Sequence, residues 1–137
     1  MSFTRKFVVL AVSALFMITG IGASAVATPA ASNGSDIKRV TLQTKGGYAN
    51  TTRNYVVAPG RPGSAQLFAI VEQPSFRELS PRYGDIDNPP CCDRAVLTLT
   101  VSYGDYLQRI QTVSGEPQPA ELAQAIELAY TYGYTLR

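Results

Sequence analysis

The stretch from Arg94 to Val113 constrains the fold more than any other part of the chain. Between residues 97 and 103, apolar side chains alternate with threonine and serine hydroxyls, which is typical of an antiparallel strand with one buried face. Gly104-Asp105 suits a two-residue turn, so the chain is expected to return as a second strand. In the predicted β-hairpin, four residues of the first strand lie opposite four of the second: Tyr103 opposite Tyr106, Val101 opposite Gln108, Leu99 opposite Ile110, and Leu97 opposite Thr112.

Residues 1–27 have the three parts of a secretory signal peptide. Arg5 and Lys6 form the charged region, an apolar run follows them, and Ala25-Val26-Ala27 is a small-x-small cleavage site. An uncleaved membrane anchor is the alternative, but the apolar run is shorter than the ~20 residues that a membrane span needs. The sequence therefore predicts a secreted, extracellular protein with no membrane attachment after cleavage near Ala27.

The remaining residues, 28–137, suffice for one compact domain but are too few for two ordinary ones. We expect a flexible lead-in over residues 28–36 and a single monomeric domain over residues 37–137. The full chain has 12 basic and 10 acidic residues, and the signal peptide holds two of the basic ones. The secreted domain would thus have no net charge, and we expect no nucleic-acid partner because such partners require a basic surface.

The segments before the central hairpin predict two strands, a helix and a long loop. The strand segments are rich in β-branched residues, and the helix segment has apolar residues at helical spacing. The loop segment has little periodicity and several prolines. The expected bounds are residues 37–45 and 51–58 for the strands, 65–73 for the helix after Ser64 as its N-cap, and 75–93 for the loop.

The segment after the hairpin predicts a closing helix, for which Pro119 suits the first turn and Gly133 the end. We expect Tyr130, Tyr132 and Tyr134 to pack against the domain rather than to form a binding platform. The predicted core stripe of this helix comprises Leu122, Ala125, Ile126 and Ala129.

The resulting order of elements is strand, strand, helix, strand, strand, helix. Two hairpins can join into one sheet, and both helices can then cover its apolar face. The sequence therefore predicts an α+β fold of ββαββα order, with an antiparallel four-stranded sheet and two helices packed on one face.

The chain contains no histidine, which excludes histidine-dependent triads, Cys-His dyads and histidine-ligated zinc. Asp85 and Asp87 in the predicted loop could pair as acid and base or hold calcium. The segment around them lacks the glycine and distal glutamate of a calcium loop, which favours ordinary solvated acids. We expect a protein that is not an enzyme and needs no metal and no cofactor.

Cys91 and Cys92 are adjacent and are the only cysteines in the chain. Exported proteins meet oxidising conditions, so both thiols are not expected to stay free. Adjacent cysteines can join only through a small strained ring, which would stiffen the loop before the central strand. We favour this intrachain disulfide, while an intermolecular bridge and free thiols stay open as alternatives.

Three features suggest a family. Gly46-Gly47-Tyr48 and Arg53 follow the first strand, Asp93 leads into the alternating central strand, and a helix closes the chain. This arrangement resembles the emfourin family, small bacterial proteinaceous inhibitors of thermolysin-like metallopeptidases. The resemblance implies that the protein blocks the cleft of a secreted thermolysin-like metalloprotease with a rigid loop.

In such an inhibitor, Gly46 and Gly47 would permit close backbone approach, Tyr48 would be an aromatic anchor, and Arg53 would make a flanking polar contact. Alternatively, the two glycines simply close a hairpin and Tyr48 packs on the sheet edge. An alternative function also stays open, that of a secreted non-catalytic structural or interaction module of the cell envelope.

Export is the first testable prediction. Expressed in a host with a compatible secretion system, the protein should be recovered outside the cytoplasm with its N-terminus at or near Thr28. N-terminal sequencing of the recovered protein checks this. A membrane-bound product that still begins at Met1 would contradict it.

The state of Cys91 and Cys92 is the second prediction. In the oxidised secreted protein, the intact mass of the monomer should be about two hydrogens below that of the reduced protein. Mass spectrometry under non-reducing conditions makes the comparison. A covalent dimer, or a monomer of unchanged mass, would reject the intrachain bond.

Overall fold

The computed structural model describes residues 36–89 and 93–135, which belong to one compact unit, Ser32–Arg137. The predicted signal peptide and nearly all of the predicted lead-in lie outside the described residues, as do Cys91 and Cys92. The predicted disulfide is therefore not addressed by the structure.

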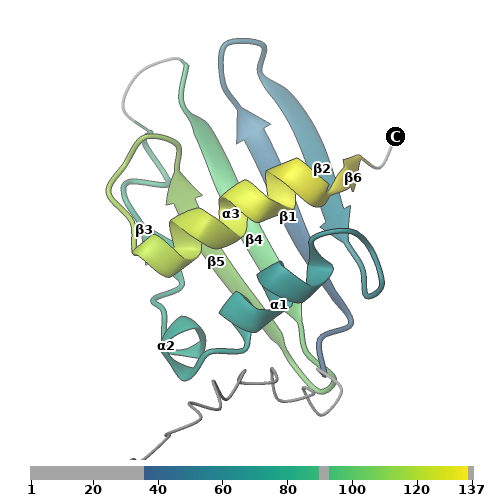
Figure 1. Cartoon of the computed structure of the whole chain (residues 1–137). Helices are drawn as coiled ribbons and strands as arrows, with labels where there is room; N and C mark the ends of the chain where they lie inside the picture. The colour runs from purple at the N-terminus through teal and green to yellow at the C-terminus, as the bar shows by residue number, and fades with distance from the viewer. Residues whose placement is uncertain (1–35, 90–92, 136–137) are drawn as a thin grey trace, which may run out of the picture. The chain divides into compact units, whose positions relative to one another are not determined.

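The described residues form one six-stranded sheet in the order β3-β5-β4-β1-β2-β6 (Figure 1). Neighbouring strands are antiparallel except β3 and β5, which are parallel. The strands are β1 (Arg39–Gly46), β2 (Thr51–Val57), β3 (Arg82–Tyr83), β4 (Ala95–Ser102), β5 (Leu107–Val113) and β6 (Tyr134–Thr135).

The α+β class is confirmed, but the predicted antiparallel four-stranded sheet is wrong because the sheet is mixed and has two more strands. Both additional strands, β3 and β6, are two residues long and lie at opposite edges of the sheet. Strands this short leave no alternating pattern in a sequence. β3 comes from the segment predicted as a loop, and β6 from the tyrosine-rich tail.

Three helices are present in the described residues rather than the predicted two: α1 (Ser64–Val71), α2 (Pro74–Arg77) and α3 (Ala120–Tyr132). α1 and α3 cover the same face of the sheet (Figure 1). α2 is a single turn that begins at Pro74, and it replaces the start of the predicted 75–93 loop.

Ser64 is not the N-cap of α1, contrary to the prediction. Gly63 occupies that position with a φ of +74°, and the Ser64 hydroxyl donates to the carbonyl of Arg61 at 2.7 Å. Only glycine fits at position 63, since a Cβ there would overlap the ring of Tyr132. The start of α1 is therefore fixed by contact with the end of α3.

The core lies between the helices and one face of the sheet. The predicted hairpin register is confirmed, since Leu99 pairs with Ile110 and Leu97 with Thr112 in β4 and β5. All four residues of the predicted α3 stripe are buried, and Gly133 ends that helix as predicted. The largest fully buried side chains include Phe76, Ile37, Leu42, Leu67, Leu99, Ile110 and Leu122.

Tyr103 joins the end of the central hairpin to the helical segment. It is 3% exposed, and its hydroxyl donates to the carbonyl of Val71 at 2.6 Å. The Tyr106 ring stacks on it with ring centroids 4.6 Å apart, and the Arg77 guanidinium lies 4.6 Å from its centroid. Burial, supported by the neighbouring Tyr106, raises the pKa of Tyr103 to about 12.

The structure predicts how Tyr103 affects stability. Because its folded pKa lies above the ordinary 10.0, its contribution is fully present below pH 10 and is lost as the pH rises through about 12. Tyr103→Phe should lower the free energy of unfolding by ~1 kcal/mol at neutral pH. It should also flatten the decline in stability above pH 10.

Urea unfolding of both proteins across this pH range measures the two effects. Tyr48→Phe is the matched control, since that side chain is 96% exposed and lies in the turn at the other end of the sheet. Parallel stability curves for Tyr103→Phe and the unsubstituted protein above pH 10 would contradict the assignment of the raised pKa to Tyr103.

Candidate functional site

The connection between β1 and β2 is a short turn with a defined backbone. Gly46 pairs with Thr51, and the four residues between them form the turn. Gly46 and Gly47 have φ values of +99° and +75°, and Asn50 has a φ of +43°. The N–H of Asn50 donates to the carbonyl of Gly47 at 2.9 Å. Positive φ values at the two glycines are accessible because glycine has no Cβ.

The base of this turn is anchored to the segment that leads into β4. Gly46 pairs with Ala95, and the N–H of Gly47 donates to the carbonyl of Arg94 at 3.4 Å. A Cβ on Gly46 would lie 3.4 Å from that same carbonyl oxygen. The turn is thus held by a neighbouring strand as well as by its own hydrogen bond, which limits its freedom to move.

Tyr48 lies within this turn and is 96% exposed. The glycines do close a hairpin, but the Tyr48 side chain does not pack on the sheet edge. Its ring is a large apolar group held in solvent on a fixed backbone. Such a group can fill a pocket of a partner with little loss of side-chain entropy. We call residues 46–51 the hairpin tip.

Arg53 does not belong to the hairpin tip. It pairs with Thr44, a buried residue of the helix-covered face, and its own side chain is exposed. The pKa of the Tyr130 hydroxyl of α3 is raised, mainly because this side chain is partly buried. A hydrogen bond with Thr44 and the positive charge of Arg53 offset part of this rise. Arg53 is therefore next to the tip along β2 but lies on the helix side.

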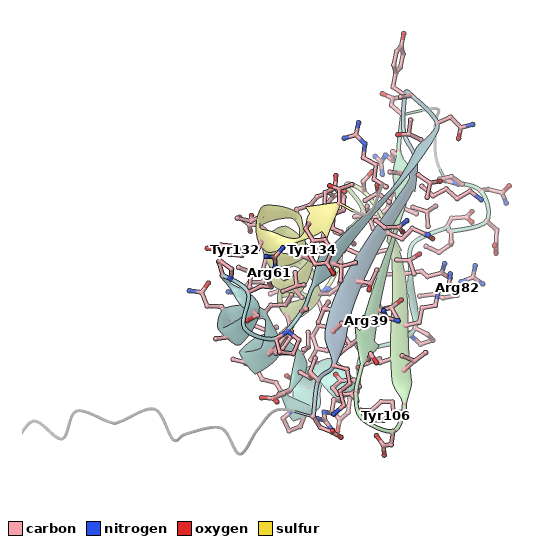
Figure 2. The ribbon with its side chains drawn as sticks, turned by 90° about the vertical axis from the view of Figure 1, so that its right-hand side faces the viewer. Arg39, Arg61, Arg82, Tyr106, Tyr132 and Tyr134 are labelled. Carbon is pink, nitrogen blue, oxygen red and sulfur yellow. The ribbon has the colours of Figure 1, made fainter. Side chains whose placement is uncertain are left out.

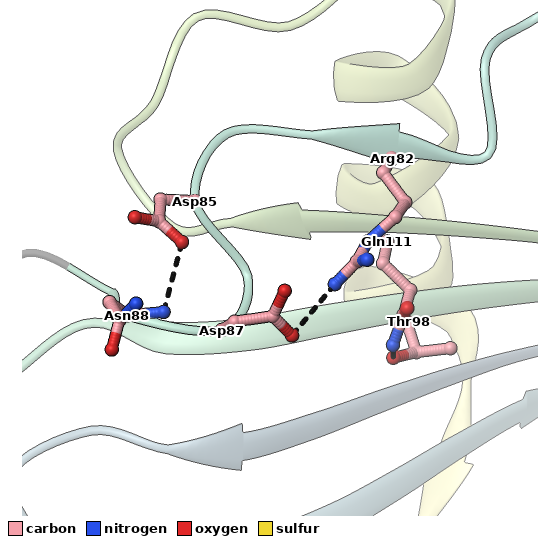
Figure 3. A network of polar contacts seen from close by, with 6 residues as sticks. All are labelled: Arg82, Asp85, Asp87, Asn88, Thr98 and Gln111. Carbon is pink, nitrogen blue, oxygen red and sulfur yellow. Dashed lines mark hydrogen bonds and ion pairs between the residues drawn. The ribbon is translucent and has the colours of Figure 1, made fainter.

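Asp85 and Asp87 shape the loop that follows β3 (Figure 3). Oδ1 of Asp87 accepts a hydrogen bond from Nη2 of Arg82 at 2.9 Å. Oδ1 of Asp85 accepts one from the backbone N–H of Asn88, also at 2.9 Å. The two carboxylates have different partners within the loop and do not form an acid–base pair. Both side chains are exposed, so the ion pair contributes little to stability.

The face of the sheet opposite the helices carries the polar side chains that alternate with the buried ones along the strands. No helix covers it in the described part of the chain, and Arg82 points to this side while Arg61, Tyr132 and Tyr134 lie on the helix side (Figure 2). We call it the open face. The loop after β3 and strands β1, β4 and β5 enclose a hollow there. In the sequence, only the polar residues that alternate with apolar ones along each strand indicate the open face.

Within residues 36–89 and 93–135, no group of three acidic or cysteine side chains is placed to hold a metal ion. Over the same residues, none of the helices has the length and apolar character needed to cross a bilayer.

Comparison with known proteins gives no match: the chain is not significantly similar to any family model, curated protein or solved structure. The hairpin tip and the open face are therefore the features of this chain that bear on its function.

Proposed function

We propose that the protein is a non-catalytic inhibitor of a secreted thermolysin-like metalloprotease, and that the hairpin tip enters the protease cleft with Tyr48 as its anchor. The observation that carries the proposal is the 96% exposure of Tyr48 on a backbone fixed by Gly46, Gly47 and Asn50. The resemblance of these residues to the emfourin pattern supplies the class of target.

The tip suits a cleft because it is a turn of only four residues whose backbone is already hydrogen-bonded. Ordering a flexible loop on binding costs free energy. This cost is smaller for the hairpin tip, because its own hydrogen bond and the Arg94 carbonyl already hold it in one conformation. Aromatic residues seated in a pocket dominate many protein interfaces. Tyr48 has the exposure and position that such an anchor needs.

The strand beside the tip adds a second means of contact. β6 pairs with β2 only at Tyr55 and Val56, so no strand within the described residues covers the outer edge of residues 51–54. An extended segment of a partner could pair with this edge through main-chain hydrogen bonds. Arg53, which lies in that uncovered length, would then contact the partner beside the edge.

The open face favours a second function, that of a secreted interaction module of the cell envelope. A hollow lined by polar side chains has the size to hold a small molecule rather than a loop of a protease. The hollow shares Gly46 and Asn50 with the hairpin tip but does not include Tyr48, so a variant at Tyr48 separates the two functions.

The anchor role of Tyr48 is testable with one variant. Tyr48→Ala should weaken inhibition of thermolysin by about thirtyfold or more, since a central aromatic anchor typically contributes ~2 kcal/mol or more. The melting temperature should change by less than about 4 °C, because substitutions of exposed side chains change the free energy of unfolding by about 0.5 kcal/mol or less. The inhibition constant and the melting temperature are measured on the same preparation.

Tyr106→Ala is the matched control, since it removes a tyrosine from the turn at the opposite end of the sheet, as the pairing of β1 with β4 requires. Its inhibition constant should not change. If the unsubstituted protein does not inhibit thermolysin-like enzymes, or if Tyr48→Ala inhibits them equally well, the proposed function is wrong.

A further inference from the structure

The open face is built from polar side chains in register across four strands. Gln43 pairs with Asn54 of β2 on one side and with Thr98 of β4 on the other, and Thr98 pairs with Gln111 of β5. Nε2 of Gln43 donates to Asn54 at 3.1 Å, and Nε2 of Gln111 donates to Thr98 at 3.4 Å. These hydrogen bonds hold the amide groups in place, so the floor of the open face is preorganised.

The loop after β3 forms a wall above this floor. Ile86 and Pro89 of the loop line a hollow of about 430 Å³, together with Gln43, Thr98 and Gln111 of the sheet. Asp87 accepts a hydrogen bond from Arg82 of β3, and Asp85 accepts one from the backbone of Asn88 within the loop (Figure 3). Sites for small molecules typically measure ~300 to 1,000 Å³, so the hollow has a suitable size.

The charges around the hollow have one sign. Among the described residues, Lys45, Arg94 and Arg109 line it, and no carboxylate does so. Arg94 forms an ion pair with Glu116, whereas Lys45 and Arg109 have no ion-pair partner within the described residues. Arg109 also lines an adjoining hollow of about 370 Å³, which places it at the boundary of both. Two positive charges in the hollow are thus left without compensation.

We propose that this hollow binds a small organic anion that carries carboxylate or phosphate groups. The planar guanidinium of Arg109 can donate two parallel hydrogen bonds to either oxyanion, and Lys45 supplies a second positive charge. The floor amides and the Thr98 hydroxyl bind polar substituents, and Ile86 and Pro89 contact an apolar part of the ligand. Gly46 and Asn50 of the hairpin tip also line the hollow, but Tyr48 does not, so the proposal can be tested separately from protease inhibition.

An NMR titration of the isotope-labelled secreted protein tests the proposal. The probes are succinate, glycerol phosphate and the neutral analogue succinamide. Succinate, glycerol phosphate or both should shift the amide signals of Lys45, Thr98 and Gln111 saturably, with a dissociation constant below ~1 mM, and succinamide should not. The anion that binds more tightly identifies the preferred oxyanion. No saturable shift with either anion, or equal binding of succinamide, would overturn the proposal.

Two variants show whether binding is local to the hollow. Arg109→Gln should weaken binding by roughly tenfold or more, because a charge-assisted hydrogen bond to the ligand is lost. Arg39→Gln is the matched control, since Arg39 alternates with buried Val40 on β1, is exposed, and does not line either hollow. It should change binding by less than about twofold. Equal weakening in the two variants would indicate diffuse attraction and overturn the proposal.

Discussion

The pairing of β1 with β4 is the interaction on which the other features depend. It joins the two hairpins into one sheet, from Arg39 opposite Ser102 to Gly46 opposite Ala95. On the inner face, this register sets Leu42 against Leu99 at the centre of the core. On the open face, the same register places Gln43 beside Thr98 in the polar floor. At the end of the pairing, it brings the hairpin tip within hydrogen-bond distance of the Arg94 carbonyl. A shift by one residue would reverse the faces and remove all three features.

Periodic patterns in the sequence predicted the central hairpin and the closing helix well. The alternation that begins at Leu97, together with the turn at Gly104, allows one register between β4 and β5. The apolar residues of α3 recur at helical spacing, so they fall on one side of the helix, which is the buried side. Shorter elements could not be predicted in this way. α2, β3 and β6 each have four residues or fewer, and tertiary contacts rather than local pattern stabilise them. The Ser64 prediction failed because the contact between Gly63 and Tyr132 joins segments far apart in the chain.

The hairpin tip was predictable in part. Gly46-Gly47-Tyr48 is an unusual combination that predicts the turn, but no sequence pattern indicates the positive φ of Asn50 or the anchoring by Arg94. Arg53 lies on the helix side because its register with Thr44 fixes its face. The hollow was missed, since it depends on where the loop after β3 lies over the sheet.

The two short edge strands have a consequence for self-association. β3 covers β5 only at Gln111 and Thr112, and β6 covers only two residues of β2, so each edge keeps an uncovered length. Each uncovered length carries an exposed arginine, Arg109 on β5 and Arg53 on β2. Two copies of the chain that pair through the same edge would bring two copies of the same arginine close together, which disfavours this self-association. A foreign strand with a carboxylate opposite either arginine would meet no such repulsion.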